Sequence, residues 1–241
     1  RAERLLVAGR VDRQEGPAAG MPEDLRLPLD LRIDDLRLSG GELRRGPATL
    51  ATLGPLALAF GYSNDQYRLQ LHRFGAAPQF EAGSAQAGVQ GQLEMSARQP
   101  YALAGRFNLT SRARVEERAL SAAGTLDLNG SLAELQAALD ARVNDAPISG
   151  TALLRPFGEV LLGEAQVRAR ALDLSALDAA LPATALDLEL TAADDGSGTL
   201  QLRNAMPGTM EQGRIPLQAL ELAFRRSEEH TSELQSQDLI A

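Results

Sequence analysis

The side chains that could support acid–base or metal chemistry are few in this 241-residue chain, and they are far apart. Histidine occurs only at His72 and His230, and there is no cysteine. Because a zinc site usually takes three or four ligands, one histidine outside the C-terminal tail cannot build one. In the segment RLQLHRFG, His72 occupies a polar position of an alternating strand. We therefore interpret His72 as a surface strand residue.

Two acidic segments are also interpreted as structural. Adjacent residues of a strand point to opposite faces, so Asp34 and Asp35 do not predict a pair of catalytic carboxylates. The apolar alternation slips by one residue at this pair, which is typical of a β-bulge. The segment DDGSG (194–198) lacks the further spaced carboxylates of a calcium loop and predicts a tight acidic turn. With no nucleophile elbow, phosphate loop or dinucleotide motif, the sequence predicts a protein that is not an enzyme, without cofactor or metal.

The composition limits the possible partners. The formal net charge is -8, whereas a nucleic-acid partner calls for a basic surface, so we expect no nucleic acid. Apolar residues make up 44% of the chain but aromatic residues only 4%, so the apolar surface is mostly Leu, Ala and Val. No run approaches the roughly 18 apolar residues of a membrane-spanning helix. Since the chain starts at Arg1 without a Met, we expect a fragment of a longer protein whose membrane anchor lies elsewhere.

Any binding residues of this chain must be positioned by strands, because strict alternation of apolar and polar residues is its dominant pattern. It is clearest in PLDLRIDDLRL (28–38), and it recurs in stripes at 56–62, 67–71, 93–95, 101–109, 126–128, 186–190, 200–202 and 220–224. Short breakers separate the stripes, among them Gly54-Pro55 and the hairpin loop 63–66. The pattern predicts a mostly β protein: a long antiparallel meander with at most one or two short helices.

Two features qualify this pattern. A Gly-x-Leu or Gly-x-Phe motif recurs at Gly41, Gly91, Gly105, Gly124 and Gly198, where we expect it to open a strand. Residues 131–143 carry a Ser-x-x-Glu capping box, so helix propensity competes with strand alternation there. Residues 172–182 could hold one short helix after the aspartate or serine near its start.

The last residues differ from the rest of the chain. RSEEHTSELQS (226–236) brings three Glu, one His and three Ser, and it resembles the translation of a sequencing adapter. We therefore divide the chain into a native β segment, residues 1–225, and a non-native tail, residues 226–241, that is disordered or helical.

Alternating strands leave two environments open for the apolar face. In a β-sandwich the face packs against a second sheet about 10 Å away. In an open trough, a single long sheet curls so that its Leu-rich inner face stays accessible to a lipid chain. Periodicity alone does not distinguish the two arrangements.

The segment NAMPGTMEQGRIPLQALELAFR (204–225) is similar to the TamB family of AsmA-like proteins, in which an Asn-x-x-Pro-Gly segment precedes a Gly-Arg-Ile/Leu-Pro-Leu strand. The segments 27–43 and 171–182 also resemble segments that recur in that family. The resemblance extends from about residue 21 to residue 225. It implies an open β-groove (a β-taco) in the periplasm of a diderm bacterium, belonging to a protein anchored in the inner membrane.

The resemblance also implies a function. Proteins of this family are linked to phospholipid transfer between membranes and to assembly of outer-membrane proteins such as autotransporters, with an Omp85-type outer-membrane barrel as a partner of regions outside this fragment. We expect phospholipid acyl chains to contact an apolar groove. Its candidate lining residues are Leu27, Leu29, Leu31, Ile33, Leu36, Leu38, Leu56, Leu58, Phe60, Leu69, Leu71, Leu103, Phe107, Leu186, Leu188 and Leu190. The alternative is a structural β-scaffold, such as an adhesin or passenger segment, with a closed dry core.

Overall fold

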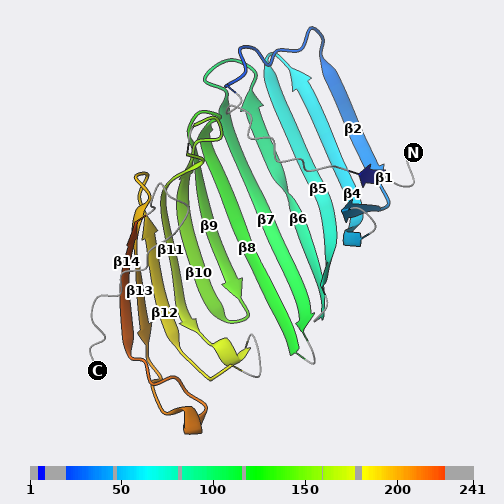
Figure 1. Ribbon diagram of the computed structural model, residues 1–241. Coiled ribbons are helices and arrows are strands. Elements are labelled where there is room, and N and C mark those ends of the chain that lie inside the picture. The colour runs from blue at the N-terminus through cyan, green and yellow to red at the C-terminus, as the bar shows by residue number, and fades with distance from the viewer. Residues whose placement is uncertain are drawn as a thin grey trace.

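The computed structural model describes residues 5–8, 20–45, 48–80, 83–115, 118–158, 160–176 and 181–225. They form one sheet of fourteen strands, a broad curved ribbon with β1 and β2 near one edge and β14 at the other (Figure 1). The strands are β1 (Leu5–Ala8), β2 (Leu31–Leu38), β3 (Gly41–Arg45), β4 (Ala48–Ser63), β5 (Gln66–Phe80), β6 (Gly83–Ser96), β7 (Ala102–Val115), β8 (Arg118–Ser131), β9 (Leu135–Val143), β10 (Ala146–Leu154), β11 (Leu162–Leu172), β12 (Leu186–Ala192), β13 (Ser197–Asn204) and β14 (Ala219–Arg225). The predicted tail, 226–241, lies outside the described residues.

The strands follow one another as an antiparallel meander, as predicted. From β3 to β14 each strand pairs with the next, and among the strands described β1 alone pairs in parallel, with β3. β2 and β3 share one edge of β4, because β2 pairs with its second half and β3 with its first half. The loop predicted at 63–66 is a two-residue hairpin turn, in which Asn64 and Asp65 have φ of 51° and 57°. Positive φ at both central residues is the signature of the type I′ turn, whose twist matches that of paired strands.

The strand register collects the apolar residues on one face. Three rows of paired residues cross the sheet from β2 to β14, and every member is apolar or glycine. The first row is Ile33, Phe60, Leu69, Leu93, Gly105, Leu128, Ala137, Ala152, Ala165, Ala192, Gly198 and Phe224. The second is Leu36, Leu58, Leu71, Gly91, Phe107, Leu126, Leu139, Gly150, Val167, Leu190, Leu200 and Leu222. The third is Leu38, Leu56, Phe74, Val89, Leu109, Gly124, Ala141, Ile148, Ala169, Leu188, Leu202 and Leu220. We call this side the apolar face and the other the polar face.

β-Bulges keep the apolar residues in phase. The β2–β4 register shifts between Ile33 and Leu36, so the bulge predicted at Asp34–Asp35 is confirmed. A second bulge in β5 lies between Leu71 and Phe74, next to His72. An extra residue would otherwise turn every following side chain to the opposite face, and a bulge absorbs it while increasing local twist. The bulges therefore preserve the rows and curl the sheet.

The apolar face of this sheet is open. All strands of the described residues belong to one sheet, so no second sheet built from them packs on this face. Its residues are accordingly half-exposed along most of its length: in β9, positions 137, 139, 141 and 143 are intermediate in exposure while the alternating polar-face residues are exposed. The described residues therefore form the predicted open β-groove and not a closed sandwich.

The helix favoured by propensity at 131–143 is not formed. Ser131 ends β8, and its hydroxyl accepts a hydrogen bond from the Glu134 amide at 3.2 Å, as a helix N-cap would. The chain then continues as β9, because Leu135 to Val143 pair with β8 and β10 on either side. The capping motif thus closes a tight loop between two strands. Pairing on both edges outweighs the small intrinsic preference for helix.

The short helix expected in 172–182 is reduced to a 3-10 turn, Leu174–Ala176, while residues 177–180 lie outside the described part. A second 3-10 turn, Met210–Gln212, lies between β13 and β14.

Two expectations about glycine were wrong. Gly91, Gly105 and Gly124 lie inside β6, β7 and β8, so the Gly-x-Leu motif does not open those strands. Gly54-Pro55 does not break the chain either, because β4 runs through it with a shift in register. A proline without an N–H group is tolerated in a strand where a bulge interrupts the ladder. The strands are therefore longer than their breakers suggested.

Candidate functional site

The predicted lining residues fall almost entirely on the apolar face. Leu31 and Leu103 lie in the row next to the three complete ones, Leu186 lies in the row on their other side, and the remaining strand residues are members of the three rows. The exceptions are Leu27 and Leu29, which lie outside the sheet in the segment before β2 and are 38% and 60% exposed. The structure therefore brings the predicted residues together on a continuous surface, with two displaced from it.

Small residues extend this surface across strands that sequence reasoning missed. β10 and β11 contribute Ile148, Gly150 and Ala152, and Ala165, Val167 and Ala169, to the three rows. Their alternation with Ser149, Thr151, Gln166 and Arg168 was the available signal, but alanine and glycine make it faint. The rows cross eleven strand-to-strand steps of about 4.8 Å each, so the apolar face is roughly 50 Å long measured along the sheet.

Aromatic rings lie over glycines on the apolar face. A Cβ atom built on Gly91 would come within 2.7 Å of the Phe107 ring, and one on Gly105 within 3.2 Å of the same ring. Phe224 covers Gly198 in the same way, with its ring 2.3 Å from the position of such a Cβ. The glycines thus leave room for large neighbours to lie against the backbone. The rings of Phe107 and Phe224 therefore fill the space above the glycines of neighbouring strands, so the apolar face has a side chain over these positions too.

A segment outside the sheet crosses one end of the apolar face. Residues 20–30, which we call the strap, run across the ends of the first strands before entering β2 (Figure 1). The Tyr101 hydroxyl donates a hydrogen bond to the Pro22 carbonyl at 2.8 Å, and the Tyr67 hydroxyl donates one to the Leu25 carbonyl. The Gln99 amide contributes a longer one, 3.4 Å, to the Pro22 carbonyl.

The most buried apolar residues of the first half of the sheet lie at the strap. Tyr101 is fully buried, and Tyr62 and Leu103 are 3% and 8% exposed. Phe60 and Leu69, one row further from the strap, are half-exposed. Burial raises the pKa of the Tyr62 hydroxyl, against a hydrogen bond from the Leu27 backbone that lowers it. The strap therefore contacts all three tyrosines of the chain.

At the other end of the sheet, the loops that precede β12 and β14 pack on each other. The Ala183 amide donates to the Gly213 carbonyl at 2.9 Å, and the Ala205 amide donates to the Ala185 carbonyl at 2.9 Å. Asn204 is 6% exposed, and its Oδ1 accepts from the Met206 amide at 3.1 Å. These loops cover Leu186 and Asn204, the last residues of their row.

The polar face carries ion pairs between neighbouring strands. Arg106 Nε lies 2.6 Å from Asp127 Oδ1, and Arg168 Nη2 lies 2.9 Å from Glu189 Oε1. The hydrogen bond from each arginine holds the pKa of its carboxyl below the ordinary value. All four side chains are exposed to solvent, so these pairs contribute little to the stability of the fold.

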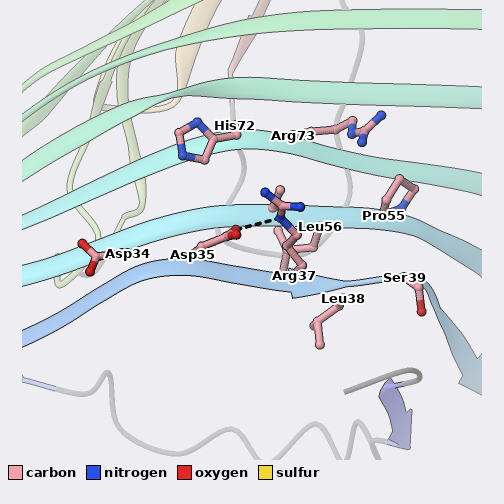
Figure 2. A pocket seen from close by; sticks show the side chains of 10 residues that line it. Asp34, Asp35, Arg37, Leu38, Ser39, Pro55, Leu56, His72 and Arg73 are labelled. Carbon is pink, nitrogen blue, oxygen red and sulfur yellow. Dashed lines mark hydrogen bonds and ion pairs between the residues drawn. The ribbon is translucent and has the colours of Figure 1, made fainter. Parts of the chain in front are cut away.

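The residues singled out for chemistry meet at a shallow concavity near the bulges of β2 and β5 (Figure 2). It is lined by Asp34, Asp35, Arg37, Leu38, Ser39, Pro55, Leu56, Ala57, His72 and Arg73. Asp35 is ion-paired to Arg37 at 2.9 Å, and Asp34 to Arg32 at 2.6 Å. His72 is exposed, as predicted for a surface strand residue. Each carboxylate thus lies beside an arginine of its own strand.

Within the described residues, no three side chains of His, Cys, Asp or Glu come together in a way that could hold a metal ion. Helices long and apolar enough to cross a membrane are likewise not found in that part of the chain. Comparison with protein-family models, with curated proteins and with solved structures finds no match to this chain. The apolar face is therefore the candidate site on its own geometry.

Proposed function

We propose that this chain is a non-enzymatic segment of a lipid conduit, in which the apolar face guides phospholipid acyl chains along the sheet. The observation that supports this function most directly is the set of three uninterrupted apolar rows from β2 to β14. These rows are half-exposed along most of their length. An apolar surface this extensive is unusual on a soluble protein and marks a site that binds another apolar body.

The chemistry of the face suits movement of a chain along it. Burying an acyl chain gains about 0.8 kcal/mol for each methylene group removed from water. The three rows hold no polar side chain that would fix a headgroup at one point, so successive positions offer similar binding free energy. We propose passive sliding with little discrimination between headgroups.

The resemblance to the TamB family gives this proposal its setting. In that setting the segment lies in the periplasm of a diderm bacterium, within a protein that supports transfer of phospholipid to the outer membrane and assembly of autotransporters. An Omp85-type barrel would be the partner of other regions of the protein. These statements rest on sequence similarity at residues 204–225, 27–43 and 171–182.

Aspartate substitutions test the proposal. Leu31→Asp and Leu58→Asp place carboxylates on the apolar face, whereas Gln92→Asp places one on the polar face and serves as the matched control. We expect the Leu variants of the full-length protein to stop lipid passage while its abundance is maintained. For the isolated chain, lipid extracted from purified protein and quantified by mass spectrometry should fall in the Leu variants only. Equal lipid in all variants, or none in the parent, would contradict the proposal.

A further inference from the structure

We infer that the strap is a displaceable internal ligand, and that the Tyr67 and Tyr101 hydroxyls beneath it form a subsite for the carboxylic ester groups of a two-chain lipid. This inference rests on the proposed function, because it names the part of the lipid that the end of the groove would recognise.

The strap lies where a lipid on this end of the groove would lie. Its contacts follow chain order: Pro22 meets Tyr101 at the start of β7, Leu25 meets Tyr67 in β5, and Leu27 meets Tyr62 in β4. The strap therefore runs across the strands, parallel to the apolar rows. Along this path it contacts the paired tyrosines 62 and 67, which belong to the same row as Leu31, Met95 and Leu103.

The polar contacts of the strap match those of an ester. Two tyrosine hydroxyls donate to two carbonyl oxygens of the strap, at Pro22 and Leu25. An ester carbonyl is an sp² oxygen acceptor of the same kind, and a diacyl lipid carries two of them next to its apolar chains. Once the strap moves, both hydroxyls lose these acceptors beside an apolar surface, where an unpaired polar group is costly. A ligand with two ester carbonyls would pair them again.

The third tyrosine provides an internal control. The Tyr62 hydroxyl donates to the Asp65 carboxylate at 3.1 Å, so it stays paired when the strap moves. Asp65 is itself held by Arg98, at 2.6 Å from its Nε. The hydroxyls of Tyr67 and Tyr101 are thus distinguished from that of Tyr62 by depending on the strap for their acceptors.

The strap is built as a replaceable segment. It contains no strand, and part of it is exposed, including Leu27 and Leu29. Its own ion pair, between Asp24 Oδ2 and Arg26 Nη2 at 2.7 Å, is internal and exposed, so it does not tie the strap to the sheet. Displacing the strap therefore breaks its hydrogen bonds with Tyr67, Gln99 and Tyr101, but it breaks no pairing between strands.

The test compares ester and ether lipids on chains with and without the strap sequence. Residues 20–28 are replaced by a Gly/Ser linker of equal length, which leaves β1 and β2 in place. Binding of a short-chain diacyl phosphatidylcholine and of its dialkyl ether analogue, which lacks both carbonyls, is measured by titration calorimetry. The linker chain should bind the diester several-fold more tightly than the parent, because the parent must first displace its strap. It should also prefer the diester to the diether by about tenfold, the range of one to two net hydrogen bonds.

Tyrosine-to-phenylalanine variants test whether the Tyr67 and Tyr101 hydroxyls cause the preference for the diester. In the linker chain, Tyr67→Phe with Tyr101→Phe should abolish the preference for the diester while leaving diether binding unchanged, whereas Tyr62→Phe should leave both unchanged. Equal affinity of parent and linker chain, or an ester preference that survives the double substitution, would overturn the inference and leave the proposed function standing. If no chain binds either lipid, the proposed function fails and the inference fails with it.

A second measurement covers the case in which a variant folds poorly. In the unmodified chain, addition of the diester should accelerate hydrogen exchange of the strap amides at Leu25 and Leu27, relative to the diether at equal occupancy. Unchanged exchange at saturating diester would show that the strap is not displaced, and would overturn the inference.

Discussion

Phe107 lies over Gly91 of the neighbouring strand, so that a Cβ atom on Gly91 would be 2.7 Å from the ring and 2.2 Å from the Arg106 carbonyl oxygen. Real Cβ atoms do not approach other atoms so closely. The two residues are paired in register, and the ring uses the space that the glycine leaves empty. This is the arrangement in which an aromatic residue compensates for a glycine in a strand.

Gly91→Ala should therefore destabilise the chain. We expect a loss of about 1–3 kcal/mol in the free energy of unfolding, the usual cost of overpacking. Gly75→Ala is the matched control, because the nearest atom to its Cβ lies at an ordinary 3.6 Å. Urea unfolding followed by circular dichroism measures both. A Gly91 variant as stable as the Gly75 variant would show that the backbone at Arg106 and the Phe107 ring both shift without cost.

Asn204→Ala should also lower stability, at the opposite end of the sheet. Asn204 Oδ1 accepts from the Met206 amide at 3.1 Å, and the substitution removes this hydrogen bond. Because Met206 is 39% exposed and the buried Nδ2 of Asn204 has no hydrogen-bond partner, we expect a loss of about 0.5–1.5 kcal/mol, the net value of one hydrogen bond. Gln201→Ala, at an exposed position of the same strand, should change the unfolding midpoint little. If the two variants have the same unfolding midpoint, the loop contacts at Asn204 do not stabilise the fold.

Acidification should loosen the strap's internal ion pair only at very low pH. The hydrogen bond from the Arg26 side chain lowers the pKa of Asp24 from its ordinary 3.8 to about 2. A carboxyl with a depressed pKa contributes stability above its unfolded value and loses it as the pH falls through the folded value. The protection of the strap amides, measured as the exchange rate relative to the intrinsic rate at each pH, should thus fall between about pH 4 and 2. Asp24→Asn should remove this fall in protection, and a fall that persists in the variant would show that other carboxyls cause it.

Leu139→Asp and Ala138→Asp should separate the two faces of β9. Leu139 is a half-buried member of the second apolar row, and Ala138 is exposed on the polar face. We expect the Leu139 variant to weaken binding of an apolar fluorescent dye such as N-phenylnaphthylamine, and the Ala138 variant to bind it as the parent does. Equal binding would indicate that the dye does not lie on the apolar face.

The sequence predicted the fold class where the apolar residues are large. The alternation of Leu29, Leu31 and Ile33, followed by a slip at Asp34–Asp35, correctly indicated a strand with a bulge, although the strand itself begins at Leu31. It failed where the face is built from small residues: β10 and β11 were not recognised, because Ala152 and Ala165 contrast weakly with their polar neighbours. Local signals also misled at Ser131, whose capping motif belongs to a loop because pairing on both sides decides the structure.

The position of the strap could not be predicted from the sequence. The apolar alternation of the strand that follows continues back through PEDLRLPLD (22–30), at Leu25, Leu27 and Leu29, and only the two prolines of the segment argue against a strand there. Its place depends on hydrogen bonds to Tyr67 and Tyr101, which lie 42 and 79 residues away along the chain. Contacts at such separations arise from the folded sheet and leave no local pattern.

The nearest-neighbour pairing of the meander makes the length of the molecule modular. Since each strand from β4 to β13 pairs only with the strands beside it, one hairpin can be duplicated or deleted without altering the pairing of the rest. Every such event would lengthen or shorten the sheet by about 10 Å, two strand spacings, and would preserve both the alternation of faces and the continuity of the rows. The length of such a sheet can therefore evolve in equal steps of one hairpin each.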